Sequence, residues 1–213
     1  AVYRPSNGTW YIIGSTQGFY GLRWGISTDV PVPADYDGDG KADVATFRNG
    51  VWYILNSQLG YTGTITHGTT GNIPVPADYD GDGKTDLAVF NGTNWSVIRS
   101  ASGLTNDLFG LVGDIPVVND YDGDGKANLA IFRPTTNTWY IAKPTGVPAQ
   151  NFDAYPFGLA TDKLAPADYD GDGRTDIAVL RNSTWWILGS RRGLITTNFG
   201  LAGDEPTPGV YIQ

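Results

Sequence analysis

The sequence contains no cysteine and no methionine, and it has one histidine, His67, and one glutamate, Glu205, among its 213 residues. The absence of cysteine excludes disulfides, thiolate nucleophiles and zinc–thiolate sites. A lone histidine gives little support for a Ser-His-Asp triad. No run of about 18 apolar residues is present, so no membrane insertion is expected. The formal net charge of −8 argues against a nucleic-acid partner, because phosphates repel an acidic protein.

The acidic residues are almost all aspartate: of 22 acids, only Glu205 is a glutamate. Glutamate is the better helix former, so this bias indicates loops with a specific geometry. The segment Asp-Tyr-Asp-Gly-Asp-Gly begins at Asp35, Asp78, Asp120 and Asp168, with spacings of 43, 42 and 48 residues. A short apolar run, a Trp-containing segment and an aromatic-Gly pair follow each loop, with His67-Gly68 as the variant pair. The whole unit therefore repeats.

The repeating unit predicts β-structure. Short β-branched and aromatic runs lie between turn residues, about four runs per unit, and no helical periodicity is sustained. Four short strands every 42 to 48 residues are typical of a β-propeller blade. We expect an all-β, five-bladed β-propeller with four-stranded antiparallel blades, forming a single domain over residues 1–213. The blades start near residues 31, 74, 116, 164 and 206. Residues 1–25 complete the last one, so the closure blade is shared between the termini.

The aspartate loops predict calcium. In the first loop, carboxylates stand at positions 1, 3, 5 and 9 and a glycine at position 6. Calcium takes about six to eight hard oxygen ligands, and alternate positions of a tight loop can converge on it. A metal-free Asx-turn hairpin is the alternative, but four carboxylates within nine residues would repel one another without a cation. We expect about four structural Ca²⁺ ions, with position 7 contributing its backbone carbonyl. The expected ligands are Asp35, Asp37, Asp39, Lys41, Asp43, Asp78, Asp80, Asp82, Lys84, Asp86, Asp120, Asp122, Asp124, Lys126, Asn128, Asp168, Asp170, Asp172, Arg174 and Asp176.

Two departures from the loop pattern affect this expectation. Asn128 replaces the position-9 aspartate of the third loop, which predicts a weaker site with one charge less. In the closure segment, Val210 and Ile212 stand where ligands would be, so no fifth site is expected.

The Phe-Gly pairs and the Asp-x-Asp-x-Asp-Gly-x-x-Asp loops resemble the FG-GAP/VCBS class of repeats over essentially the whole chain. That class occurs in integrin α-subunit propellers, bacterial surface proteins, a fungal integrin-like lectin and some polysaccharide lyases. The resemblance implies structural calcium within each blade and a secreted or cell-surface location, in a bacterium. Integrin propellers and the fungal lectin have seven blades, so their ligand sites are not carried over to five.

Most aromatic residues fall at repeat positions and are expected in the core between blades. Four apolar residues share one repeat position and are expected to pack as well: Phe19, Tyr61, Leu104 and Leu194. Tyr20, Phe152 and Tyr155 do not follow the repeat, and the last two lie in the longest insertion, from Lys143 to Pro156. Such a loop suits ligand contact, so these three are the candidate ligand-binding residues, with simple loop packing as the alternative.

Little supports catalysis. Only Asp107, Asp153 and Glu205 are acids without a repeat explanation, whereas glycoside hydrolysis needs two carboxylates with separate roles. His67 replaces the aromatic of the aromatic-Gly pair, which favours a structural role. Arginines also recur, at Arg4, Arg48, Arg133 and Arg181. They are expected to pair with nearby acids, the alternative being a ring of anion contacts.

Three functions remain. The leading expectation is a non-enzymatic binding or adhesion module for a glycan, an extracellular protein or the extracellular matrix. The second is a structural subunit of a surface fibre, layer or adhesin that self-associates through the split closure blade. The third is an enzyme of the polysaccharide-lyase type.

Overall fold

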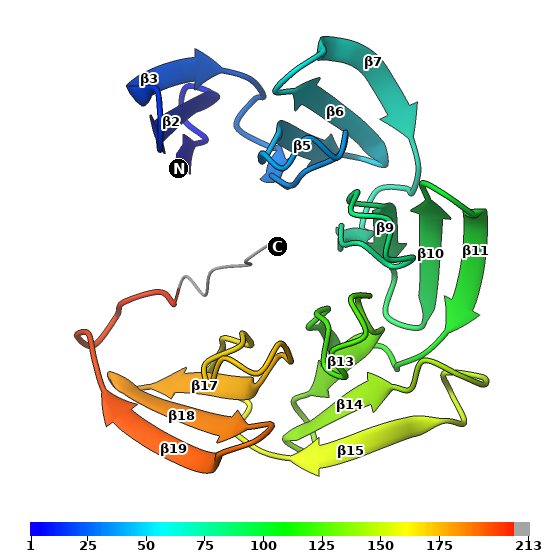
Figure 1. The fold of residues 1–213 in the computed structure, drawn as a ribbon, viewed down its shortest axis with the longest axis vertical. Helices are drawn as coiled ribbons and strands as arrows, with labels where there is room; N and C mark the ends of the chain where they lie inside the picture. Colours follow the sequence, from blue (N-terminus) through cyan, green and yellow to red (C-terminus); the bar gives the residue numbers. More distant parts are fainter. Residues whose placement is uncertain (207–213) are drawn as a thin grey trace. The chain divides into compact units, whose positions relative to one another are not determined.

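The computed structural model describes residues 1–206, and their regular structure consists of 19 β-strands in five antiparallel sheets (Figure 1). The chain divides into two compact units. Unit 1 comprises Ala1–Ala77, Asp82–Asn91 and Ser96–Thr105, and unit 2 comprises Asp78–Gly81, Gly92–Trp95 and Asn106–Gln213.

Unit 1 contains two complete sheets, whose strands follow one another in chain order. The first sheet consists of β1 (Val2–Arg4), β2 (Thr9–Gly14) and β3 (Gly18–Arg23). The second consists of β4 (Val30–Pro31), β5 (Val44–Arg48), β6 (Val51–Asn56) and β7 (Gly60–Thr66).

Unit 2 also contains two complete sheets, and the unit boundary passes through one more. The sheet at the boundary consists of β8 (Ile73–Pro74), β9 (Leu87–Phe90), β10 (Asn94–Arg99) and β11 (Gly103–Leu108). The two sheets of unit 2 consist of β12 (Ile115–Pro116), β13 (Ala130–Arg133), β14 (Thr138–Ala142) and β15 (Phe152–Pro156), and of β16 (Lys163–Leu164), β17 (Ile177–Arg181), β18 (Thr184–Gly189) and β19 (Gly193–Asn198).

The predicted fold class is confirmed: the protein is all-β and is built from four-stranded antiparallel β-propeller blades, five sheets in all over residues 1–206. The first sheet has three strands within these residues. The fourth strand that the sequence predicts for it, from residues 206–213, lies outside the described residues apart from Pro206.

Turn chemistry and side-chain alternation explain the blades. Asn49 and Gly50 join β5 to β6 with φ of 50° and 85°, the left-handed geometry of a two-residue hairpin turn. A Cβ on Gly50 would lie 2.3 Å from the carbonyl oxygen of Gly68, so only glycine fits. Trp52 then alternates inward and is fully buried.

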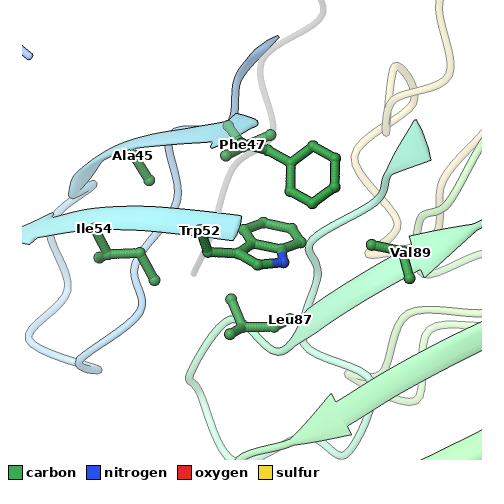
Figure 2. Close-up of a cluster of buried hydrophobic side chains, with 7 residues drawn as sticks. Ala45, Phe47, Trp52, Ile54, Leu87 and Val89 are labelled. Atoms are coloured by element: carbon green, nitrogen blue, oxygen red, sulfur yellow. The ribbon is translucent and has the colours of Figure 1, made fainter. Parts of the chain in front are cut away.

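The core of unit 1 lies between the inner strands of successive blades. Figure 2 shows Ala45 and Phe47 from β5, Trp52 and Ile54 from β6, and Leu87 and Val89 from β9 gathered in one cluster. The Phe47 and Trp52 rings lie 5.1 Å apart in an edge-to-face arrangement. A matching cluster in unit 2 centres on Trp139.

The repeated tryptophan has one hydrogen-bonding role in all five sheets. Its indole N–H donates to the backbone carbonyl of the aromatic-Gly pair that follows the outer strand. The donors and acceptors are Trp10 to Trp24, Trp52 to His67, Trp95 to Phe109, Trp139 to Phe157 and Trp185 to Phe199, at 2.8–3.2 Å. The bond is buried at Trp52 and Trp95, part-buried at Trp10 and Trp139, and exposed at Trp185. A carbonyl that is removed from water needs such a donor, which favours tryptophan at this position.

Candidate metal centre

Each aspartate loop folds around its first carboxylate. In the first loop, Asp35 Oδ1 accepts hydrogen bonds from the backbone N–H of Gly38 (2.7 Å) and Asp39 (3.2 Å), and Asp35 Oδ2 accepts one from Gly40 (2.8 Å). Gly38 and Gly40 have φ of 79° and 81°, which a residue with a side chain rarely adopts. Asp120 and Asp168 accept the equivalent bonds in the third and fourth loops. In the fourth loop, burial raises the pKa of Asp168, but these bonds outweigh it and the net pKa is lowered.

The position-9 carboxylate joins the loop to the hairpin of its own blade. Asp43 is 1% exposed and accepts hydrogen bonds from the backbone N–H of Tyr36 (2.9 Å) and Ser57 (2.6 Å). Burial raises the pKa of Asp43, and the charges of Asp37 and Asp35 add to that rise. Asp176 makes the equivalent bonds to Tyr169 and Ser190 in the fourth loop.

A serine that the sequence interpretation missed holds the position-5 carboxylate. The Ser57 hydroxyl donates to Asp39 Oδ2 at 2.9 Å, and the Ser190 hydroxyl donates to Asp172 Oδ2 at 2.9 Å. The bond from Ser57 lowers the pKa of Asp39. The signal in the sequence is a serine 18 residues after the position-5 aspartate. In the third unit the hairpin turn is two residues longer, and the register places Pro144 at the position of this serine.

Three of the predicted ligand carboxylates converge in each of three loops. They offer oxygens that lie within 4.8 Å of one another, and the sets are Asp35, Asp37 and Asp39, then Asp120, Asp122 and Asp124, then Asp168, Asp170 and Asp176. Among the described residues, one buried position-3 oxygen in each set accepts no hydrogen bond: Asp37 Oδ2, Asp122 Oδ1 and Asp170 Oδ1. Asp170 is only 7% exposed. A buried carboxylate oxygen without a donor, beside two more carboxylates, is an environment that a hard cation fits.

The unit boundary passes through the second loop, so its halves are described separately. In unit 2, Asp78 Oδ1 accepts a hydrogen bond from the Gly81 N–H at 2.6 Å. In unit 1, Asp82 Oδ2 accepts one from the Ser100 hydroxyl at 2.6 Å, which lowers the pKa of Asp82. Asp86 is 1% exposed and accepts the Ser100 N–H at 2.7 Å. Each half repeats the geometry of the first loop.

The third loop differs at Asn128. Its Oδ1 accepts the Tyr121 N–H at 2.7 Å, as Asp43 accepts that of Tyr36. Its Nδ2 donates to Asp122 Oδ2 at 3.2 Å. One position-3 oxygen therefore has an amide donor, while Asp122 Oδ1 has none among the described residues. The weaker site expected here stays a prediction.

The recurring arginines form ion pairs within the blades. Arg48, Arg133 and Arg181 each make two hydrogen bonds to the aspartate 19 residues earlier, at 2.5–2.9 Å. Each guanidinium also lies 4.5–5.5 Å from the centre of an aromatic ring. Because their donors are directed at buried aspartates, pairing with acids is confirmed over the ring of anion contacts for these three. Arg4 lies over the Tyr11 ring at 4.4 Å.

The candidate ligand residues lie on strands. Phe152 and Tyr155 belong to β15, so the prediction that they lie in an inserted loop is wrong. Strand alternation points them to opposite faces, and they do not form a joint platform. Phe152 packs against Tyr140 and Phe109, at ring distances of 5.6 and 6.0 Å. Tyr20 lies on β3, and all three side chains are 38–39% exposed.

The residues at the Phe19 position pack only in part and are not buried: the Phe19 ring stacks on Tyr11 at 6.5 Å, and the Tyr61 ring lies edge-on to Trp24 at 5.2 Å. Phe19, Tyr61, Leu104 and Leu194 are exposed by 70%, 52%, 61% and 59%. The register adds Phe152, because it pairs with Ala142 as Phe19 pairs with Ile13 and Leu194 with Leu188. The longer hairpin loop of that blade had hidden this equivalence. Each outer strand therefore begins with an exposed large apolar side chain.

Other candidate groups have structural partners. His67 is 9% exposed, and its Nε2 lies 2.8 Å from the Ser96 carbonyl oxygen. Asp153 pairs with Lys143 at 2.9 Å, and Glu205 pairs with Lys163 at 2.6 Å. No helix long and apolar enough to cross a membrane occurs in the described residues.

Comparison with known proteins extends the resemblance. The sequence model described as FG-GAP-like repeat matches residues 35–89 and 120–179. A solved Agrocybe aegerita lectin, described as specifically recognising non-reducing terminal N-acetylglucosamine, is similar with 17% identity and a TM-score of 0.59, over 90% of this chain and 59% of the lectin. No curated protein matches the sequence.

Two further structures share the fold. A functionally unknown protein from Desulfotomaculum acetoxidans has 11% identity and a TM-score of 0.55, over 91% of this chain and 63% of that one. BBS1N, solved in complex with ARL6DN, has 10% identity and a TM-score of 0.55, over 91% and 62%. The chain thus spans about three-fifths of the length of these structures.

Proposed function

Because this chain belongs to the family of FG-GAP-like repeat proteins, we propose that it is a calcium-stabilised β-propeller that binds ligands outside the cell rather than catalysing a reaction. The ligand class is a glycan or an extracellular protein. Lectin and protein-complex propellers among the structural neighbours support a binding role.

Calcium is proposed for the four aspartate loops. The support comes from the first, third and fourth loops, where one position-3 oxygen has no donor among the described residues and lies beside two other carboxylates, with Asp170 only 7% exposed. Asp168, Asp170 and Asp176 would hold the ion in the fourth loop, with further oxygens from Asp172 and the Arg174 carbonyl. The ion would supply the positive charge that offsets the clustered carboxylates. Its role would be structural, since each loop joins the first two strands of its four-stranded blade.

The observation that carries the binding role is the exposed apolar side chain at the start of every outer strand. These residues are 38–70% exposed, yet the position is apolar in all five blades: Phe19, Tyr61, Leu104, Phe152 and Leu194. Exposed aromatic rings offer flat apolar faces to sugars or to protein side chains. Repetition over the blades would give several equivalent contacts and raise the overall avidity.

The test is a glycan array that includes terminal N-acetylglucosamine, probed with the protein in calcium and in chelator. Phe19→Ser and Tyr61→Ser should each weaken binding and lower the melting temperature only slightly, because both side chains are more than half exposed and each loses one ring contact, with Tyr11 and Trp24 respectively. Val112→Ser is the matched control, because Val112 is 87% exposed but does not belong to the five apolar residues at the start of the outer strands. This variant should bind normally. If glycan binding is unchanged in both Phe19→Ser and Tyr61→Ser, the exposed apolar residues of the outer strands do not contact the ligand. An array without any bound sugar would leave a protein ligand, which immobilised extracellular-matrix proteins would then test.

A second function, self-assembly, is favoured by the first sheet. Within residues 1–206 this sheet has three strands, whereas the other four have four. An edge strand such as β1 is a template for pairing with another segment. Light scattering over a range of concentrations separates the two functions: a monomer of 22.9 kDa throughout excludes stable assembly. Incubation with acidic polysaccharides, followed by a search for unsaturated products, tests the lyase alternative.

A further inference from the structure

Successive aspartate loops are linked to one another by backbone hydrogen bonds. The Thr85 N–H of the second loop donates to the Asp35 carbonyl oxygen of the first at 2.7 Å. Two more bonds of the same length join Ala127 to Asp78 and Thr175 to Asp120. In every case position 8 of one loop donates to position 1 of the loop before it. The link is therefore a repeated feature of the fold.

Side-chain packing reinforces each link. The aliphatic stem of Lys84, at position 7, lies against Gly38, at position 4 of the preceding loop. A Cβ on Gly38 would lie 3.0 Å from Lys84 Cγ, closer than ordinary contact allows. Lys126 lies against Gly81 and Arg174 against Gly123 with the same spacing, 3.0–3.1 Å. The position-7 side chains therefore cover the preceding loop, and the glycines leave room for them.

One peptide group faces both loops. The N–H of Thr85 and the C=O of Lys84 belong to the same planar peptide, so fixing one end orients the other. The C=O is the oxygen that position 7 is expected to offer in the second loop. The N–H contacts the carbonyl of Asp35, whose carboxylate is an expected ligand in the first loop. Hydrogen-bonded peptides polarise one another, and a chain of such bonds strengthens cooperatively by roughly 10–30% per bond.

We infer that the four loops bind divalent cations with positive cooperativity, transmitted through the peptide between positions 7 and 8. This inference rests on the proposed calcium binding. A cation held by one loop fixes that peptide, which pre-orders position 1 of the preceding loop and lowers the cost of ordering it. Coupling is reciprocal, so the preceding loop aids the following one equally. Repulsion between cations in neighbouring loops opposes the effect, and the sign of the measured coupling decides between the two.

The cation affinity of the third loop should gain most from cooperativity with its neighbours. This loop is linked on one side through Ala127 to Asp78 and on the other through Thr175 to Asp120. It also has the smallest negative charge, because Asn128 replaces an aspartate. A loop with weak intrinsic affinity and two linked neighbours should fill late when alone and earlier when its neighbours are filled.

The experiment is a calcium titration of the full chain followed by NMR, with the position-6 glycine amides as site-specific reporters. Gly40, Gly125 and Gly173 each donate to the position-1 carboxylate of their own loop and so report its occupancy. Asp170→Asn should abolish or weaken binding in the fourth loop. It should also lower the affinity of the third loop by about fivefold, the low end of typical coupling between sites.

A matched pair of proline substitutions tests the route. Thr175→Pro removes the N–H that donates to the Asp120 carbonyl and should uncouple the third and fourth loops. Ala42→Pro occupies the same loop position, but within the described residues the Ala42 N–H has no inter-loop acceptor. It should leave the coupling of the other loops intact, while sharing any local distortion that proline introduces. If Thr175→Pro does not fold, Asp170→Asn still decides the question, because it leaves the backbone unchanged.

The outcomes separate the two proposals. If calcium binds at every loop and Asp170→Asn leaves the affinity of the third loop unchanged, the proposed cooperativity is wrong but the calcium assignment stands. The same holds if Thr175→Pro and Ala42→Pro change the coupling between the third and fourth loops equally. The absence of calcium binding at all four loops would overturn the proposed metal sites themselves.

Discussion

Replacing Trp139 by phenylalanine tests the hydrogen bond that recurs in every blade. Trp139 is fully buried, and its indole N–H donates to the Phe157 carbonyl oxygen at 3.1 Å. Its ring packs against Phe132 with centroids 5.6 Å apart. Phenylalanine keeps an aromatic ring in the core but removes the donor. The variant therefore isolates the polar contribution better than alanine would.

The expected loss has two parts. The Phe157 carbonyl is part-buried, and leaving it without its donor costs about 2 kcal/mol. The smaller ring leaves roughly 40 Å³ of extra volume, which at the usual cavity coefficient adds about 1 kcal/mol. The sum of about 3 kcal/mol should lower the melting temperature by roughly 6–12 °C for a chain of this size.

Calorimetry in excess calcium measures the shift, and Trp185→Phe is the control. Trp185 makes the same bond at 3.2 Å, but its acceptor residue, Phe199, is 75% exposed, so water can replace the lost donor. About 1 kcal/mol or less is expected there. Equal shifts for the two variants, or a shift below about 2 °C for Trp139→Phe, would refute the role assigned to the Phe157 carbonyl.

Four further predictions concern the loops and the ion pairs. Chelation should lower the melting temperature, because each bound loop adds about 2.7 kcal/mol of stability when the free calcium concentration is about 100 times the dissociation constant. An unchanged melting curve would contradict the calcium assignment. Ser190→Ala, which frees a position-5 oxygen from its hydroxyl donor, should alter calcium affinity at the fourth loop alone in a site-resolved titration. Asn128→Asp should raise affinity at the third loop, and equal affinity would show that the amide is not limiting. Burial raises the pKa of Asp29, but hydrogen bonds from Arg48 and the backbone outweigh it and the net pKa is lowered. The pair therefore stabilises the fold above the unfolded pKa of about 3.9 and loses this effect as the pH falls below it, so Asp29→Asn melting should depend less on pH between about 5 and 3.

The repeat predicts much of the fold because both the blades and the loops are local in sequence. Each antiparallel sheet joins neighbouring strands through short turns, so spacing and turn residues suffice to place it. The first-loop glycines and Asp35 lie within six residues of one another, and their geometry follows from the same local pattern. The ion pair between Arg48 and Asp29 was expected only as a default, because its partner lies 19 residues away.

Burial at a repeat position is harder to predict. Repetition shows that an environment recurs, but it does not show whether that environment is inside or outside. Trp52 and Phe19 both recur, yet Trp52 is fully buried and Phe19 is 70% exposed. The hydrogen bonds between loops are equally hard to predict from the sequence, because the bond from Thr85 to Asp35 depends on how neighbouring blades pack.

The third blade differs from the others by two linked substitutions, and together they explain its loop. In the first loop, position 9 accepts the N–H of Ser57, whose hydroxyl also holds position 5. In the third, the hairpin turn is two residues longer, so the strand register places Pro144 at the Ser57 position, and proline has neither a hydroxyl nor a backbone N–H. An aspartate at position 128 would lose that hairpin donor, whereas Asn128 brings a donor of its own to Asp122. The amide thus compensates for the missing serine inside the loop, and the three remaining carboxylates still converge within 4.8 Å. The third loop therefore keeps a cation site of reduced charge. At such a site, cooperativity with neighbouring loops should have its largest effect on cation affinity.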